Sequence, residues 1–310
     1  MSLEILIMIL ATAVTAGTPI LFAALGEVLT ERAGILNLGV EGMMLMGAVT
    51  GFITVVITGN LFFAVLGAMV AAGLLALVHA FLSITLKANQ VVSGLALTIF
   101  GTGFSGFLGK EYVGTPVPLA FGKWEIPILS EIPFLGPILF KQDTLVYLSY
   151  FLVLALWIFL YKTRPGLHLR GIGENPAAAD AVGVNVFGLR YLYVVFGGML
   201  AGLGGAYLSL AYAPSWLEHM TAGRGWIAVA LVIFATWNPA RALLGAYIFG
   251  GIDALGFRMQ ALGIVIPSFF LKMLPYLFTI LVLIIVTRET SKRKAAVPAA
   301  LGIPYDRQER

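Results

Sequence analysis

The sequence of 310 residues contains no cysteine and few charged residues. The absence of cysteine excludes disulfides, thiolate metal ligands and thiol nucleophiles. Charged residues make up 11% of the chain, whereas soluble domains carry about 25%. The formal net charge of +4 is small, and it is better explained by unequal charge in loops than by affinity for nucleic acid.

Motifs for catalysis and cofactor binding are also missing. The Gly-Lys pairs at 109–110 and 122–123 lack the glycine spacing and the following Ser or Thr of a P-loop. His79, His168 and His219 are far apart and have no metal-ligand spacing, so we expect each at a helix end or in packing. The sequence contains neither G-x-S-x-G nor H-E-x-x-H. We therefore expect no enzyme activity, no cofactor and no metal site.

Apolar residues are abundant. They account for 60% of the chain, compared with about 45–50% in soluble domains. A soluble core of this size could not bury so much apolar surface, whereas a lipid bilayer accommodates it. The 36 glycines are typical of helices that pack closely within lipid. The predicted fold class is an all-α integral membrane protein.

A helix that spans the bilayer needs about 20 mostly apolar residues. By this criterion the sequence predicts about nine spans (eight to ten), at 3–26, 34–58, 61–86, 91–109, 144–161, 191–212, 222–238, 240–257 and 268–287. The apolar stretch from Met1 to about Leu29 is too long for a signal peptide and lacks its basic start. We therefore interpret it as the first span.

Lys and Arg residues indicate the orientation, because cytoplasmic loops are enriched in them. With nine spans and an external N-terminus, the cytoplasmic segments hold thirteen of the 19 Lys and Arg residues and the outer segments hold six. The cytoplasmic set is Arg32, Lys87, Lys162, Arg164, Arg170, Arg190, Arg241, Arg288, Lys292, Arg293, Lys294, Arg307 and Arg310. We therefore expect the N-terminus outside and the C-terminus in the cytoplasm.

We expect one transmembrane permease domain over residues 1–310, with three extramembrane segments. The external segment 110–143 contains five prolines, which prevent a long helix. It is either an irregular lid or part of a docking surface for an external protein. The tail 288–310 is polar and basic; it is a topology signal, and we expect it to be disordered or to lie on the anionic inner leaflet.

The third segment, the cytoplasmic loop 162–190, predicts a short helix over 176–182. Asn175 is a favourable N-cap, Pro176 fits the first helical position, and Gly183 can end the helix in the left-handed conformation. A helix of two turns is too short to be stable alone in water, so it needs a partner surface. That surface is either another protein or the membrane face of the same chain.

Two membrane segments depart from plain apolar spans. In 31–48, Asn37 and Glu41 are four residues apart, so on a helix they would share one face. Polar residues and glycines within an apolar segment indicate a broken or closely packed helix that lines a cavity. The other interpretation places this segment at the membrane interface, where polar residues are tolerated. In 223–251, Pro239 interrupts a short apolar run, which indicates either a binding site or an ordinary tight turn.

Three stretches carry a resemblance to a known family. They are ERAGILNLGVEGMMLMGA (31–48), RPGLHLRGIGENPAAADAVGVNV (164–186) and GRGWIAVALVIFATWNP (223–239). The chain resembles permeases of ABC importers for ribose and other simple sugars. Within that superfamily it is most similar to the nucleoside-type branch, which works with a binding lipoprotein of the basic-membrane-protein type. The similarity covers nearly the whole chain.

The resemblance implies a multi-pass protein of the cytoplasmic (inner) membrane and several partners. These are a twin-domain ATPase, a second permease subunit in a heterodimer or homodimer, an extracytoplasmic substrate-binding protein and membrane lipid. ATP hydrolysis would take place in the ATPase, and the short cytoplasmic helix would carry its movement into the membrane for alternating access. The implied coupling residues are Arg170, Gly173, Glu174, Asn175, Ala178, Ala179 and Gly183.

Candidates for the translocation pathway are Asn37, Glu41 and Trp226, because an amide and an indole can hydrogen-bond to or stack on a sugar or nucleobase. Two alternatives stay open. One is an ion-coupled secondary transporter, which the scarcity of charges within the spans disfavours. The other is an ABC permease for branched amino acids.

Overall fold

The computed structural model describes residues 3–261 and 297–307, together with residues 270, 273–274, 276–277, 280–281 and 284. The elements run in the order α1 (Leu3–Arg32), α2 (Val40–Thr58), α3 (Leu61–Ala80), the π-helix η1 (Phe81–Thr85), α4 (Gln90–Gly109), η2 (Lys110–Tyr112), β1 (Lys123–Glu125), η3 (Leu129–Glu131), α5 (Leu135–Leu139), β2 (Lys141–Asp143), α6 (Thr144–Lys162), α7 (Arg164–Glu174), α8 (Pro176–Ala181), α9 (Val186–Tyr207), the π-helix η4 (Leu208–Tyr212), α10 (Arg224–Phe234) and α11 (Pro239–Ala261).

Long apolar helices confirm a membrane protein. In the described part of the chain, six helical segments are long and apolar enough to cross a bilayer: Leu3–Arg32, Val40–Thr58, Leu61–Thr85, Gln90–Tyr112, Thr144–Lys162 and Val186–Tyr212. They correspond to the first six predicted spans. The predicted span 268–287 lies largely outside the described residues. The total of nine spans therefore stays a prediction.

The predicted span 222–238 differs from the structure. Helix α10 has 11 residues, which at 1.5 Å per residue is about 16 Å, half of the roughly 30 Å of a hydrocarbon core. The chain then turns through Thr236 and Trp237, which both have positive φ. Pro239 is the first residue of α11, where its missing N–H costs nothing. The proline thus begins a helix after a tight turn.

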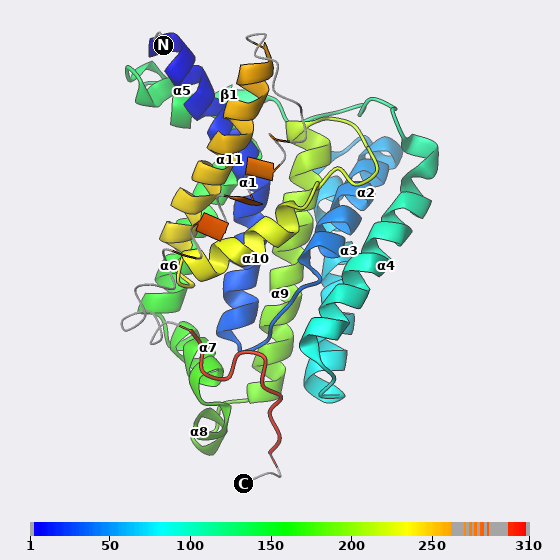
Figure 1. The fold of residues 1–310 in the computed structure, drawn as a ribbon, viewed down its shortest axis with the longest axis vertical. Helices are drawn as coiled ribbons and strands as arrows, with labels where there is room; N and C mark the ends of the chain where they lie inside the picture. The colour runs from blue at the N-terminus through cyan, green and yellow to red at the C-terminus, as the bar shows by residue number, and fades with distance from the viewer. Residues whose placement is uncertain are drawn as a thin grey trace.

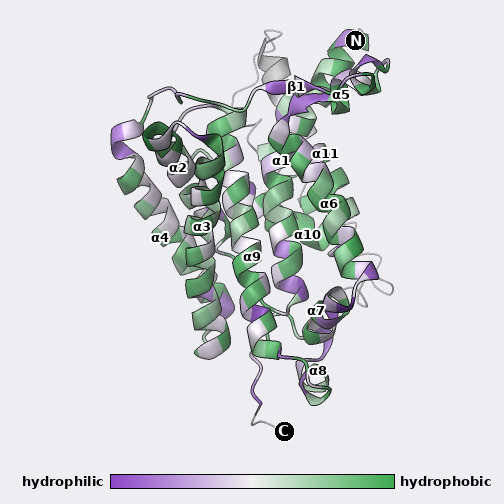
Figure 2. Ribbon diagram, turned by 180° about the vertical axis from the view of Figure 1, so that it is seen from behind, coloured by the Kyte–Doolittle hydropathy of each residue, from purple (hydrophilic) through white to green (hydrophobic). Residues whose placement is uncertain are grey.

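The helices form a bundle with α1 and α9 at its centre and α2, α3 and α4 along one side, as Figure 1 shows. The N-terminus, α5 and β1 lie at one end of the bundle, and α7, α8 and the segment 297–307 lie at the other. Apolar residues dominate the bundle, and polar residues gather on β1, on α7 and along the C-terminal segment (Figure 2). The two polar ends are consistent with two aqueous faces.

The segment 110–143, predicted to be external, contains short elements and no long helix, in agreement with its prolines. Strands β1 and β2 pair antiparallel, with Lys123 opposite Asp143. Asp143 also caps α6 by accepting hydrogen bonds from the backbone N–H groups of Leu145 and Val146. Asp143 therefore connects the two-stranded sheet to the start of α6, through its strand pairing and its side-chain cap.

Small residues allow the central helices to touch. A row of small residues, Gly198-xxx-Gly202-xxx-Ala206, lies on α9, where Gly202 faces Ala72 of α3 and Gly47 of α2. A Cβ atom built on Gly202 would lie 2.5 Å from the Ala72 Cβ and 2.6 Å from the Ala68 carbonyl oxygen. Helix association in lipid depends on such close approach, because no hydrophobic effect drives it there.

We predict that Gly202→Ala destabilises the protein by about 1–3 kcal/mol, the usual range for an overpacked core. The added methyl group must push α3 away from α9. Thermal unfolding in detergent, followed by circular dichroism, measures the effect. Gly103→Ala on α4 is the matched control, because nothing lies within 4 Å of its Cβ position. Equal melting temperatures for the two variants would contradict this account of the packing.

Candidate functional site: the coupling helices and the linker between α1 and α2

The predicted cytoplasmic helix is present as α8 (Pro176–Ala181). The Asn175 side-chain oxygen accepts a hydrogen bond from the backbone N–H of Ala178 at 2.9 Å. Gly183 has a φ of 85°, the left-handed conformation expected at the end of this helix. The local structure of α8 is therefore confirmed, with its last residue one position earlier than predicted.

The sequence analysis missed a second helix, α7 (Arg164–Glu174), which directly precedes α8. Two signals could have revealed it. Thr163 accepts a hydrogen bond from the Gly166 N–H as N-cap, and Pro165 lies in the first turn. Three of the expected coupling residues, Arg170, Gly173 and Glu174, belong to this helix.

Helix α7 packs closely on the end of α1. A Cβ atom on Gly173 would lie 2.2 Å from the carbonyl oxygen of Arg32, so the two backbones are in contact. A carboxylate oxygen of Glu174 lies 4.0 Å from the Arg32 guanidinium. Arg170 instead stacks over the Tyr161 ring, with 5.5 Å between guanidinium carbon and ring centroid. Of the three predicted coupling residues on α7, Gly173 and Glu174 thus contact α1, and Arg170 contacts α6.

Helix α8 presents one face outward. Ala178 is exposed, whereas Ala179 is buried against the protein. The exposed side chains are small, so a partner surface could approach the helix backbone closely. Among the predicted coupling residues on α8, Ala178 is the one accessible to a partner, and Ala179 fixes the helix on its own chain.

The C-terminal segment 297–307 packs against α7 and α8. The Ala300 N–H donates to the Gly173 carbonyl at 2.8 Å, and the Tyr305 hydroxyl donates to Asp180 at 3.1 Å. Arg307 forms an ion pair with Asp180, and its hydrogen bonds to the Asp180 carboxylate raise the pKa of its guanidinium. The expectation of a disordered tail is therefore wrong for residues 297–307, because Asp180 and the α7 backbone provide partners for it.

The linker between α1 and α2, residues 33–39, is buried but not helical. We expected Asn37 and Glu41 on one face of a single helix. Instead, Gly34 with a φ of 84° ends α1, and α2 begins only at Val40. The expectation of a shared helical face is therefore wrong, because Asn37 lies in the linker and Glu41 lies in the first turn of α2. The break itself agrees with the expectation of a broken helix.

Four side chains from helices α3, α4 and α9 form hydrogen bonds with the backbone of this linker. Buried peptide groups need hydrogen-bond partners, because an unpaired N–H or C=O group that is hidden from water costs free energy. The partners are Arg190 Nε to Ala33 O (3.0 Å), Gln90 Oε1 from Leu36 N (2.7 Å), His79 Nε2 to Leu36 O (3.1 Å) and Thr98 Oγ1 to Leu38 O (2.8 Å). The sequence analysis assigned no such role to these side chains.

Asn37 and Glu41 connect the linker to other helices. The Asn37 amide donates to Glu27 Oε1 of α1 at 3.0 Å, and its oxygen accepts from Gly39 N–H at 2.9 Å. The Glu41 carboxylate accepts three hydrogen bonds from the start of α10, from the Thr221 hydroxyl (2.6 Å) and the N–H groups of Gly223 (2.9 Å) and Gly225 (2.7 Å). Glu41 thus fixes the N-terminal end of the short helix.

Trp226, the third pathway candidate, is half-buried and follows Gly225 on α10. A Cβ atom on Gly225 would lie 2.6 Å from the Cα atom of Glu41. Trp226 and Glu41 therefore lie at one junction of α2 and α10. A different tryptophan, Trp237, uses its indole N–H to donate to Glu31 of α1 at 2.6 Å.

We predict that Glu41→Gln lowers stability by about 1.5–3 kcal/mol, the range for a hydrogen bond to a charged group. The amide NH₂ would face a backbone N–H where the carboxylate now accepts, so one buried donor loses its partner. Thermal unfolding in detergent measures the change. Glu111→Gln is the control, because Glu111 is exposed. A Glu41→Gln variant as stable as this control would show that the carboxylate is dispensable.

Comparison with known proteins places the chain in a family. Residues 9–287 match the model of the branched-chain amino acid transport system permease component. TsgC13 of Haloferax volcanii, named for a glucose ABC transporter permease, is 44% identical over 97% of this chain and 98% of its own.

Two further relatives are named for nucleosides. The nucleoside ABC transporter permease NupC of Lactococcus lactis is 36% identical and covers 96% of both chains. The guanosine ABC transporter permease NupQ of Bacillus subtilis is 35% identical and covers 99% of both chains. The chain is a multi-pass membrane protein that belongs to this family of ABC transporter permeases, which are transport subunits rather than enzymes and work with an ATPase and a substrate-binding protein.

Proposed function

We propose that this chain is the permease subunit of an ATP-driven importer that moves nucleosides or simple sugars across the cytoplasmic membrane by alternating access. Residues 1–310 form its single transmembrane domain. The observation that carries the proposal is α8: an exposed, capped helix joined to α7, which contacts the end of α1. The relatives named for nucleosides and glucose support the substrate class.

Movement of the ATPase would enter the permease along one route. A displacement of α8 shifts α7, and the contacts of Gly173 and Glu174 with Arg32 pass the shift to α1 and the linker. Glu41 then connects the linker to the start of α10. Interfaces of this kind favour two discrete arrangements over continuous deformation, which is what alternating access requires.

Asn37, Glu41 and Trp226 are our candidates for the translocation pathway. The polar atoms of Asn37 and Glu41 already bond within the protein, so we assign them the positioning of α2 and α10. Trp226 is half-buried, and its indole is therefore the group that could stack on a sugar or nucleobase.

We propose that the end of the bundle with α7, α8 and residues 297–307 is cytoplasmic, and that the opposite end, with the N-terminus and the segment 110–143, is external. Figure 1 shows these elements at the two ends. The enrichment of Lys and Arg in the segments predicted to be cytoplasmic supports this assignment. The external segment would then face the substrate-binding protein, and a second permease subunit would complete the pathway.

Affinity purification of this chain from its native membrane tests the assembly. We expect a two-domain ATPase, a second permease and a substrate-binding lipoprotein to co-purify. Binding of nucleosides or sugars to the lipoprotein would support the proposed substrate class. Preferential binding of branched amino acids, which the family description allows, would show that these are the substrates instead. A chain that purifies alone and transports in liposomes without ATP would be an ion-coupled carrier instead.

We predict that Ala178→Arg and Glu174→Ala each reduce substrate-dependent ATP hydrolysis and uptake in proteoliposomes by about tenfold. A tenfold loss corresponds to a docking free energy that is weaker by about 1.4 kcal/mol. Arginine would hold the partner away from α8, and alanine would remove the Glu174 contact with α1. Ala178→Ser keeps the side chain small and is the control. The coupling role would be refuted if both variants inserted normally and kept wild-type hydrolysis and uptake.

A further inference from the structure

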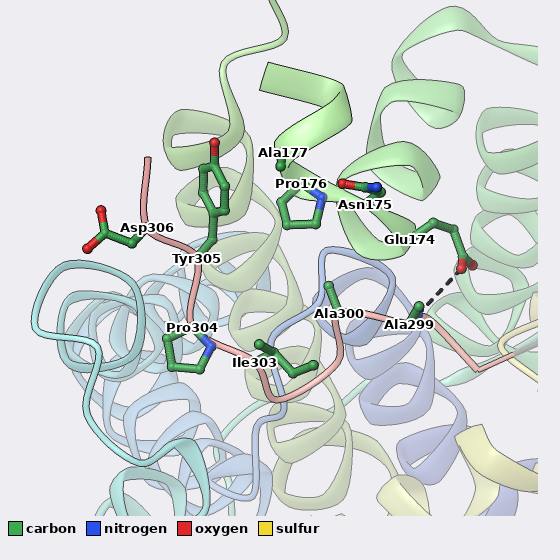
Figure 3. A pocket seen from close by; sticks show the side chains of 10 residues that line it. All are labelled: Glu174, Asn175, Pro176, Ala177, Ala299, Ala300, Ile303, Pro304, Tyr305 and Asp306. Carbon is green, nitrogen blue, oxygen red and sulfur yellow. Dashed lines mark hydrogen bonds between the residues drawn. The ribbon is translucent and has the colours of Figure 1, made fainter. Parts of the chain in front are cut away.

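A pocket of about 330 Å³ lies between the C-terminal segment and the start of α8. Its walls come from both elements, as Figure 3 shows: Pro176 and Ala177 on one side, and Ala300, Ile303 and Pro304 on the other, with Glu174 at one end. The walls are largely apolar, and the carboxylate of Glu174 is about half exposed, with 48% of its side chain accessible.

The two walls are held in a defined relation by hydrogen bonds and an ion pair. Ala299 N–H donates to Glu174 at 3.4 Å, drawn as the dashed line in Figure 3. Tyr305 extends toward α8 and donates to Asp180. Its ring also packs against Phe187 of α9, with 5.7 Å between the centroids. The pocket is therefore a composite of α8 and the C-terminal segment rather than a gap beside a loose tail.

The same segment reaches the opposite side of the bundle. Gly302 N–H donates to the Gly34 carbonyl of the linker at 3.2 Å. Asp306 forms an ion pair with Lys87, which follows η1. A side chain that enters the pocket would thus contact both α8 and the C-terminal segment. That segment is bonded directly to the linker and to Lys87, just after η1.

We propose that the ATPase docks on this composite surface and inserts into the pocket a side chain with an apolar stem and a positively charged end, as an arginine or lysine has. This inference rests on the proposed function, since it takes α8 as the contact site of the ATPase. The apolar walls suit the stem. Glu174 suits the charge, because among the described residues its ion-pair partner is Arg32 alone, at 4.0 Å. The pocket also includes Ala177 on the exposed face of α8.

Cross-linking tests the location, and the absence of cysteine makes each introduced thiol unique in the chain. The variants Ala177→Cys and Ile303→Cys place a thiol on either wall, and Ala299→Cys is a second exposed position in the C-terminal segment. Leu86→Cys is the matched control, because Leu86 and Ile303 are both 57% exposed. Each variant is treated with a short bifunctional thiol–amine reagent in the assembled transporter, and the product with the ATPase is quantified.

We expect adducts with the ATPase from Ala177→Cys and from Ile303→Cys or Ala299→Cys, at several times the yield from Leu86→Cys. Adducts from Ala177→Cys alone would overturn the composite surface and leave the coupling role of α8 intact. Equal yields from Ile303→Cys and Leu86→Cys would also overturn it. No adduct from any position on either wall would remove the coupling role and this inference together.

A pair of substitutions with opposite charge tests the chemistry of the inserted side chain. Ile303→Lys would place a positive charge in the pocket, and Ile303→Glu would place a negative charge of similar bulk there. Since like charges at an interface are unfavourable, we expect the lysine variant to retain about tenfold less ATPase on affinity beads than the glutamate variant. Equal retention, or a preference for the lysine variant, would overturn the positively charged occupant.

Discussion

The non-helical backbone between α1 and α2 is the constraint on which the rest of the structure depends. Buried peptide groups in a membrane protein must be hydrogen-bonded by the protein itself. Residues 33–39 meet this requirement with side chains from α3, α4 and α9, and with a backbone contact from Gly302. The polar residues of an otherwise apolar bundle are therefore concentrated around one break in the helices.

The linker lies between the proposed coupling helices and α10. It contacts the C-terminal segment directly and lies next to Arg32, on which α7 packs. At its other end, Glu41 fixes the start of α10. If α7 and α8 receive the movement of an ATPase, as we propose, a small displacement there meets hydrogen bonds that cannot be stretched gradually, because each broken bond would leave a buried group without a partner.

Close contacts between helices hold the bundle together. Where Gly202 of α9 meets Ala72 of α3, the chains are near enough that one methyl group would force them apart. Lipid provides no hydrophobic force between helices, so association depends on packing of this kind. The short helix α10 is held by polar contacts as well, since Glu41 accepts hydrogen bonds at its start and Arg224 forms an ion pair with Asp253 of α11.

The sequence by itself determined the membrane environment, the six long apolar helices and the helix at 176–181, because these depend on composition, length and local capping. Local patterns indicated a broken or closely packed helix in 31–48 but could not reveal that Asn37 leaves the helix of Glu41. The break is stabilised by residues that are distant in sequence, such as Arg190, which is 157 positions from Ala33. Local patterns also could not place residues 297–307, whose partners lie on α7 and α8. Contacts between distant segments exist only after folding, so tertiary structure alone decided them.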